Sequence, residues 1–102
     1  MTRSEMVEIL SSELDGVENL FALKNESCGA SDDAFHNFRS TAKRILGGDS
    51  HMHMFQVLLT YMDKHMVALA NRGITERECK ERLRDIIVYS LIGIAMVEGL
   101  AE

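Results

Sequence analysis

Apolar residues recur at intervals of three and four along four stretches of the chain, with polar residues between them. Positions three and four apart share one face of an α-helix, so this spacing predicts helices. The predicted helices cover residues 4–23, 32–46, 51–71 and 76–100, with a loop at 25–31 and a break at 47–50. The chain has no proline and seven methionines, which also favours helix. The predicted fold class is all-α, a four-helix bundle that forms a single domain over residues 1–102.

The ends of the predicted helices carry residues that cap or weaken a helix. Ser31 or Asp32 can cap the second helix with a side-chain oxygen. Thr75 and Glu78 have the spacing of a capping box, in which Thr75 accepts a hydrogen bond from the Glu78 amide while Glu78 reaches back. Glycine is a poor helix former, so we expect a bend or fraying at Gly16 in the first helix.

The last predicted helix changes character along its length. Its first half is charged and amphipathic, whereas residues 86–97 are apolar apart from Ser90 and Gly93. This run is too short to span a bilayer, so we expect it to be buried in protein. A helix that is apolar on every side must be covered on every side. Three helices of the same chain can provide that cover, and so can a second subunit. We expect a homo-oligomer.

The bulk composition excludes several classes of partner. The formal net charge is −5 and only 6% of residues are aromatic, so the sequence offers no platform for nucleic acid and no attraction to anionic membranes. The first ten residues lack the apolar core of a signal peptide. Cys28 and Cys79 are far apart and have no further cysteines near them, which is typical of reduced thiols. We therefore expect a cytoplasmic protein without nucleic-acid or membrane partners.

Three polar residues of the last helix, Arg82, Asp85 and Tyr89, share one face because they are three and four positions apart. Asp85 is the last charge before the apolar run, so its carboxylate needs a cation, a metal or hydrogen-bond donors. One interpretation is structural: Asp85 pairs with Arg82 or Lys64, and Tyr89 closes the network. The other is a ligand site, in which Asp63 or Lys64 of the third helix points inward and faces Asp85.

The histidines show no arrangement that predicts a metal site or a catalytic triad. His51 and His53 point to different sides of a helix and have no third ligand nearby. We interpret them as exposed residues at the start of the third helix. His36 and His65 are isolated in the sequence.

Four motifs, taken in order, resemble those of a known family. They are Lys24–Gly29, Asp32–Phe38, Leu59–Met66 and Arg82–Tyr89. Their order is similar to that of small phage and prophage proteins of the MazG-like, all-α nucleotide pyrophosphohydrolase group, especially those described as nucleotide-modification-associated. The resemblance extends over about residues 20–97, which is most of the chain.

The resemblance implies a helical bundle assembled as a dimer or larger oligomer, with a nucleotide pocket and Mg²⁺ held by carboxylates. The cation would shield the polyphosphate and lower the pKa of the attacking water. Matched residue by residue, Asp85 corresponds to the catalytic and metal-binding acid of the last helix, Glu26 to the loop acid that also binds the metal, and Lys64 to the phosphate-facing lysine. The expected ligand-binding residues are Lys64, Arg82, Tyr89, Glu26 and Asn37.

The chain departs from the hydrolytic members at their carboxylates. Those proteins carry Glu-x-x-Glu on one helix and Glu-x-x-Asp on a later one. Here the second and third predicted helices contain no Glu-x-x-Glu, and Arg82 stands three positions before Asp85. Glu26 lies one position before the loop aspartate of the family, and Cys28 replaces its tyrosine.

The sequence therefore predicts a phage-type MazG-like protein that binds a nucleoside polyphosphate with Mg²⁺, with hydrolysis left open. The alternative is a catalytically degenerate binding protein that sequesters a nucleotide signal or inhibits a host defence protein. A third interpretation is a purely structural helical oligomer.

Overall fold

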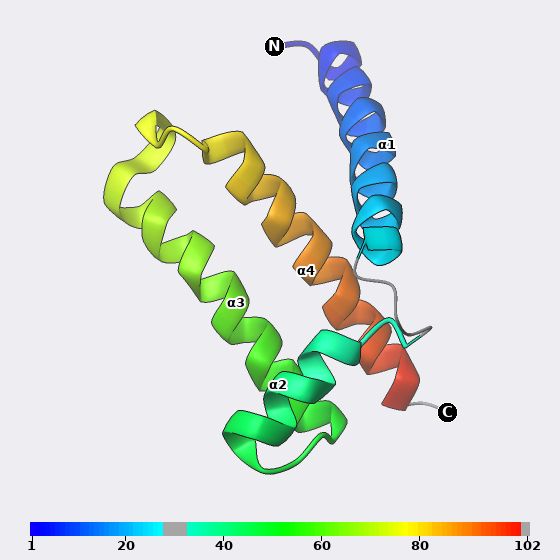
Figure 1. Cartoon of the computed structure of the whole chain (residues 1–102). Helices are drawn as coiled ribbons and strands as arrows, with labels where there is room; N and C mark the ends of the chain where they lie inside the picture. The colour runs from blue at the N-terminus through cyan, green and yellow to red at the C-terminus, as the bar shows by residue number, and fades with distance from the viewer. Residues whose placement is uncertain (28–32, 101–102) are drawn as a thin grey trace. The chain divides into compact units, whose positions relative to one another are not determined.

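The computed structural model describes the backbone of residues 1–27 and 33–100; within these ranges the side chains at positions 20, 22–27 and 100 are not described. The elements are α1 (Arg3–Ser27), α2 (His36–Leu46), α3 (His51–Arg72), the short 3-10 helix η1 (Gly73–Thr75) and α4 (Cys79–Leu100) (Figure 1). The described residues contain no strand. The all-α prediction is confirmed.

Contacts divide the chain into two units, Met1–Asp32 and Asp33–Glu102. The single domain and the four-helix bundle stay predictions, because both concern the two units together. Along the described part of the chain, no helix combines the length and the apolar character that crossing a membrane requires.

The first unit contains α1, a helix of 25 residues. Val7, Leu10, Leu14, Val17 and Phe21 are separated by three, four, three and four residues and therefore form one stripe along the helix. The helix continues through Gly16, so the fraying expected there does not occur.

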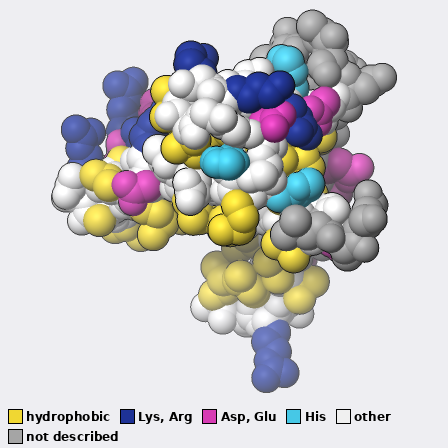
Figure 2. Space-filling model, turned by 90° about the horizontal axis from the view of Figure 1, so that it is seen from below, with side chains coloured by type: hydrophobic (Ala, Val, Ile, Leu, Met, Phe, Trp, Pro, Cys, Tyr) yellow, Lys and Arg dark blue, Asp and Glu magenta, His cyan; other side chains and the backbone are white. Residues whose placement is uncertain are grey.

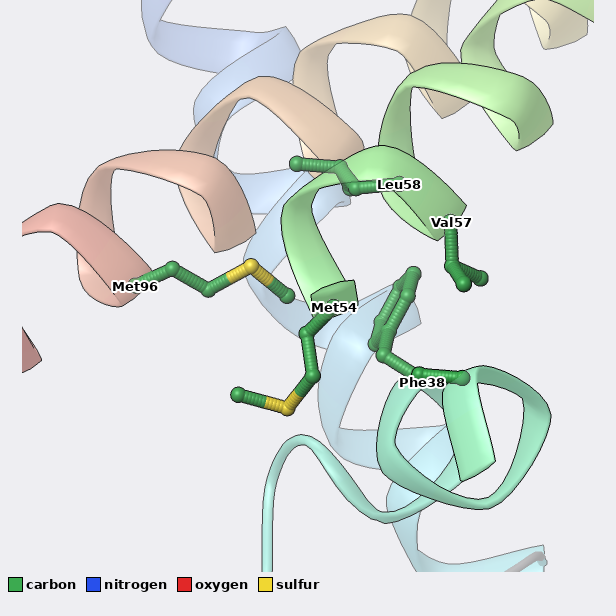
Figure 3. Packing of buried hydrophobic residues seen from close by; sticks show 6 residues of the cluster. Phe38, Met54, Val57, Leu58 and Met96 are labelled. Carbon is green, nitrogen blue, oxygen red and sulfur yellow. The ribbon is translucent and has the colours of Figure 1, made fainter. Parts of the chain in front are cut away.

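The second unit is built around the antiparallel pair α3 and α4, which η1 joins, with α2 packed against α3 (Figure 1). Its core comes from all three helices. Figure 3 shows Phe38 of α2 beside Val57 of α3, and the Met96 side chain of α4 extending toward Met54 of α3. The fully buried side chains Met54, Leu58 and Met96 each contribute roughly 2 kcal/mol through the apolar area removed from water.

The close approach of α4 to α3 depends on Gly93. A Cβ atom at this position would lie 2.9 Å from the Leu58 Cδ2 atom, which is closer than side-chain carbons pack. Gly93 is buried, so the apolar run contains glycine at a point where α4 packs closely against Leu58 of α3.

The predicted helix ends are correct for α3 but wrong for α2 and α4. Ser50 caps α3, and its Oγ accepts a hydrogen bond from the His53 amide at 3.2 Å. α2 begins at His36 rather than at 32, because the Asp33 carboxylate accepts from the Phe35 amide at 3.0 Å and first forms a turn. Ser31 and Asp32, the predicted caps, lie outside the described residues.

The predicted capping box of α4 does not form. The Thr75 hydroxyl donates to the Arg72 carbonyl at 2.7 Å, and the Glu78 amide donates to Glu76 Oε2 at 2.6 Å. η1 occupies residues 73–75, and α4 begins at Cys79 rather than at 76. Glu76 therefore supplies the side-chain oxygen that we expected from Thr75.

Candidate functional site

Five charged or titratable side chains meet where α3 passes through η1 into α4. We call them the corner cluster: His65, Arg72, Glu76, Arg82 and Asp85. His65 Nε2 lies 3.6 Å from Asp85 Oδ2, and Arg82 Nη1 lies 3.3 Å from His65 Nδ1. Arg82 Nε lies 3.4 Å from Glu76 Oε2, and Arg72 Nη1 lies 3.6 Å from Glu76 Oε1. The cluster thus links α3 to α4 through a chain of polar contacts.

Glu76 is the most deeply buried acid of the cluster, with only 3% of its side chain exposed. Removing a carboxylate from water is costly unless opposite charges and hydrogen bonds replace the water. Here one carboxylate oxygen accepts the Glu78 amide, and two guanidinium groups face the two oxygens. These contacts compensate the burial and fix the start of α4.

His65 connects the two charged ends of the cluster. It is 7% exposed and lies on α3 between Arg82 and Asp85. A guanidinium group can only donate, so the contact with Arg82 requires Nδ1 of His65 to be an acceptor. The proton of the neutral ring then lies on Nε2, which faces the Asp85 carboxylate. The arrangement selects one tautomer of the neutral imidazole.

Tyr89 joins the cluster to an aromatic group at the centre of the unit. Its ring centroid lies 5.9 Å from that of His65, 6.2 Å from that of Tyr61 and 6.4 Å from that of Phe38. Burial raises the pKa of the Tyr89 hydroxyl, and the negative charge of Asp85 raises it further. Tyr89 therefore stays neutral and acts here through its ring and its hydroxyl group.

Arg82 has unused hydrogen-bonding capacity. Its Nε atom is buried and makes no hydrogen bond within the described residues, although the Glu76 carboxylate attracts it from 3.4 Å. A guanidinium group has five N–H donors in a fixed plane and can bind one anion with two of them. Arg82 is the side chain of the cluster best suited to an additional anionic group.

The structure brings together only some of the predicted site residues. Arg82, Asp85 and Tyr89 lie in or beside the cluster, as expected from their shared face. Lys64 is exposed on α3 and has no ion pair among the described residues, and Asn37 is exposed in the first turn of α2. The Glu26 side chain lies outside the described residues.

Three residues of the cluster were not predicted from the sequence: His65, Arg72 and Glu76. His65 was interpreted as an isolated histidine. A signal was present, since it lies seven positions after Leu58 and three after Met62, on the apolar face of α3. Glu76 stands in the first turn of the predicted helix 76–100, where an acid interacts favourably with the helix dipole. Its partners are side chains from both sides of the turn, which the local sequence does not reveal.

The predicted Mg²⁺ site of Asp85 and Glu26 stays a prediction, because the Glu26 side chain lies outside the described residues. Across residues 1–27 and 33–100, no group of three or more His, Cys, Asp or Glu side chains is placed to hold a metal ion. Asp85 Oδ2 lies 3.6 Å from His65 Nε2, whereas Glu76 is held by two guanidinium groups. Mg²⁺ commonly binds through one or two carboxylates together with substrate phosphates. An ion near Asp85 would therefore have to enter with the phosphates of its ligand.

The predicted interpretation of His51 and His53 as exposed residues is only partly correct, because both are half-buried. The His51 ring lies edge-on to Phe35, with the ring centroids 6.5 Å apart. His53 Nδ1 lies 2.6 Å from Ser50 Oγ. These contacts are those of a helix start.

A second charged cluster lies on the outside of α2. Arg39 Nε donates to Asp33 Oδ2 at 2.9 Å, and Asp49 Oδ2 lies 3.6 Å from Arg39 Nη1 and 3.4 Å from Lys43 Nζ. We call it the α2 cluster. The hydrogen bond from Arg39 lowers the pKa of Asp33 and raises that of Arg39. All four side chains are between 34% and 64% exposed, so this cluster is open to water.

An apolar groove of about 570 Å³ runs between α3 and α4. Its lining is mostly apolar: Phe55, Leu58, Leu59, Met62, Tyr89, Ser90, Gly93, Ile94, Val97 and Glu98. Along its outer side, which includes Ile94 of the groove lining, α4 exposes large apolar side chains. Ile87 is 39% exposed, Leu91 48% and Ile94 56%. The expectation that the apolar run is buried is therefore correct for its inner side and wrong for its outer side.

Comparisons with family models, with curated proteins and with solved structures give no match for this chain.

Proposed function

We propose that the chain binds a phosphorylated small molecule, a nucleoside polyphosphate, at the corner cluster, in the cytoplasm and without a complete hydrolytic site of its own. One observation carries the proposal. Arg82, Asp85 and Tyr89 meet His65 at a place that water can reach, since 20% of the Arg82 side chain and 28% of the Asp85 side chain are exposed. Buried ionisable groups with an opening to solvent are common in ligand sites.

The charges of the cluster determine how such a ligand would bind. The positive charges of Arg72 and Arg82 are balanced by the carboxylates of Glu76 and Asp85. A phosphate must therefore compete with carboxylates for the Arg82 guanidinium group. We propose Lys64, an exposed basic residue of α3 next to His65 in the chain, as the source of further positive charge. Mg²⁺ bound to the phosphates would reduce their repulsion from Asp85.

Calorimetric titration of the whole chain with ATP and GTP, with and without Mg²⁺, tests the proposal. We expect heat of binding and no release of pyrophosphate. Lys64→Ala should weaken binding several-fold through loss of a phosphate contact. Arg44→Ala is the matched control, because Arg44 is an exposed basic residue on α2, away from the cluster.

Asp85→Asn separates the ligand site from a structural role. If the cluster binds a nucleotide, this variant should have a lower nucleotide affinity in Mg²⁺ and should keep its fold. A destabilised Asp85→Asn protein with unaltered affinity would remove the site assignment. The absence of any nucleotide heat would remove the proposal, and turnover would show that the site is hydrolytic after all.

A second candidate is a binding protein that inhibits a host defence protein. The observation that favours it is the apolar outer side of α4, since monomeric proteins seldom expose a large contiguous apolar surface without a partner. Figure 2 shows hydrophobic side chains at the surface beside charged ones. The two candidates differ in location: nucleotide binding depends on the corner cluster, whereas protein binding depends on α4 residues such as Leu91.

A further inference from the structure

The outer side of α4 carries an ordered stripe of residues. Lys80, Arg84, Ile87, Leu91, Ile94 and Glu98 are separated by four, three, four, three and four positions. This alternation keeps all six on one side of the helix and is the spacing of a two-stranded coiled-coil seam. We call them the α4 stripe. They span about 27 Å at 1.5 Å per residue.

The charges of the stripe are arranged by sign. Its first positions, Lys80 and Arg84, are basic, its centre is apolar, and its last position, Glu98, is acidic. Lys80 and Glu98 are exposed. A helix of this kind is complementary to a copy of itself that runs in the opposite direction, because the basic end of each then meets the acidic end of the other.

We propose that the α4 stripe is the interface of a homodimer in which two α4 helices pack antiparallel about a twofold axis between Ile87 and Leu91. In this register Ile87 packs against Leu91 of the partner subunit, and Lys80 faces Glu98 of the partner subunit. The twofold axis repeats each contact, so two apolar layers lie between two opposite-charge pairs. This inference does not depend on nucleotide binding.

Arg84 has a different role in this register. It lies opposite Ile94 of the partner subunit, so its methylene stem covers that side chain while its guanidinium group stays at the edge. Arg84 also interacts within its own chain. The proposed interface requires only its stem.

The size of the exposed surface suits a reversible dimer. Leu83 and Val97 extend the apolar surface beside the stripe and are 49% and 59% exposed. Together with all six residues of the stripe they offer on the order of 600 Å² per copy, or about 1,200 Å² for the pair, at the lower edge of specific interfaces. We therefore expect dissociation in the micromolar range rather than an obligate dimer.

Sedimentation equilibrium of the full chain between about 1 µM and 1 mM tests the proposal, because a reversible dimer depends on concentration. We expect the mass to rise from 11.5 kDa toward twice that value. A mass of 11.5 kDa at every concentration would overturn the proposal.

Leu91→Glu places a carboxylate at the centre of the stripe and should keep the protein monomeric over the whole range. Val67→Glu is the matched control, because Val67 on α3 is 49% exposed, against 48% for Leu91, and lies outside the stripe. Circular dichroism should show that both variants keep their helix content. Equal dimerisation of the two variants would overturn the interface assignment.

Charge reversal tests the antiparallel direction. Lys80→Glu turns two attractive pairs into repulsive ones and should weaken the dimer about tenfold. Glu98→Lys should do the same. The double variant Lys80→Glu with Glu98→Lys restores both pairs in the antiparallel register, so its affinity should return to that of the original chain. If the double variant stays as weak as the single ones, the antiparallel register is wrong.

Discussion

The corner cluster and the α2 cluster are built from the same kinds of side chain but differ in burial. In the corner cluster, 3% of the Glu76 side chain is exposed, and the acid meets two guanidinium groups. In the α2 cluster, Asp33 and Arg39 are 34% and 35% exposed, although their hydrogen bond of 2.9 Å is the shorter contact. A short distance between charges does not by itself make a pair strong. The contribution of a pair depends on the free-energy cost of removing one partner and leaving the other charge uncompensated. This cost is large only where the remaining charge is buried away from water.

The largest expected effect is at Glu76. Glu76→Gln would leave Arg72 and Arg82 facing an uncharged group, and we expect the free energy of unfolding to fall by about 3 kcal/mol. Glu78→Gln is the control, because this exposed acid lies on the same turn and should change stability by less than about 0.5 kcal/mol. Urea unfolding followed by circular dichroism measures both values. Equal losses would contradict the difference between the clusters.

A smaller effect is expected at Arg39. Arg39→Gln should lower the free energy of unfolding by about 0.5 kcal/mol. Water screens the attraction between the exposed charges and solvates both side chains when they separate. The loss should shrink further in 1 M salt, where charges are screened within ~3 Å. The loss at Glu76 should persist in the same salt. Unfolding curves for both variants at low and high salt make this test.

Lowering the pH should remove the stabilisation that the α2 cluster provides through Asp33. Because the hydrogen bond from Arg39 lowers the pKa of Asp33 below its ordinary value of 3.8, the folded protein binds this proton less readily than the unfolded chain. The stabilisation is therefore complete above the unfolded pKa and is lost as the pH falls through the folded one. Asp33→Asn should be less stable than the original chain at pH 6, by a few tenths of a kcal/mol.

The same variant tests the direction in which this stabilisation changes with pH. Melting temperatures of Asp33→Asn and the original chain should approach each other as the pH falls from about 6 to about 3. A difference that grows toward low pH would show that Asp33 is not stabilised in its charged form.

The smallest effect is expected at Thr75. The hydroxyl is exposed and donates to the Arg72 carbonyl, so it does not cap α4. Thr75→Ala should change stability by less than about 0.5 kcal/mol, rather than by the ~1 kcal/mol typical of a helix cap. A loss near the larger value would mean that α4 is capped from Thr75 in solution.

Much of the second unit could be predicted from spacing alone. The α3 boundaries follow from residues that stop and cap helices, and the shared face of Arg82, Asp85 and Tyr89 follows from their separations. The contact between Arg82 and His65 joins residues 17 positions apart and depends on how α3 and α4 pack. No local pattern contains that information.

The error at Thr75 has a different cause. Thr75 and Glu78 fit the capping pattern, but Gly73 adopts a positive φ of 60° and continues the chain into η1. This turn directs the Thr75 hydroxyl back to α3. Glu76 is then held by Arg72 and Arg82, and its carboxylate reaches the Glu78 amide first. Tertiary charge pairing thus determines the helix start, overriding a correct local motif.

The aromatic group around Tyr89 determines what intrinsic fluorescence can report about unfolding. The chain has no tryptophan and two tyrosines, and both tyrosines lie in that group with their ring centroids 6.2 Å apart. Intrinsic fluorescence therefore reports only on residues 33–102, whereas far-ultraviolet dichroism also includes α1. Two unfolding curves that coincide would show that the units unfold together, and two separate curves would show that α1 is lost on its own.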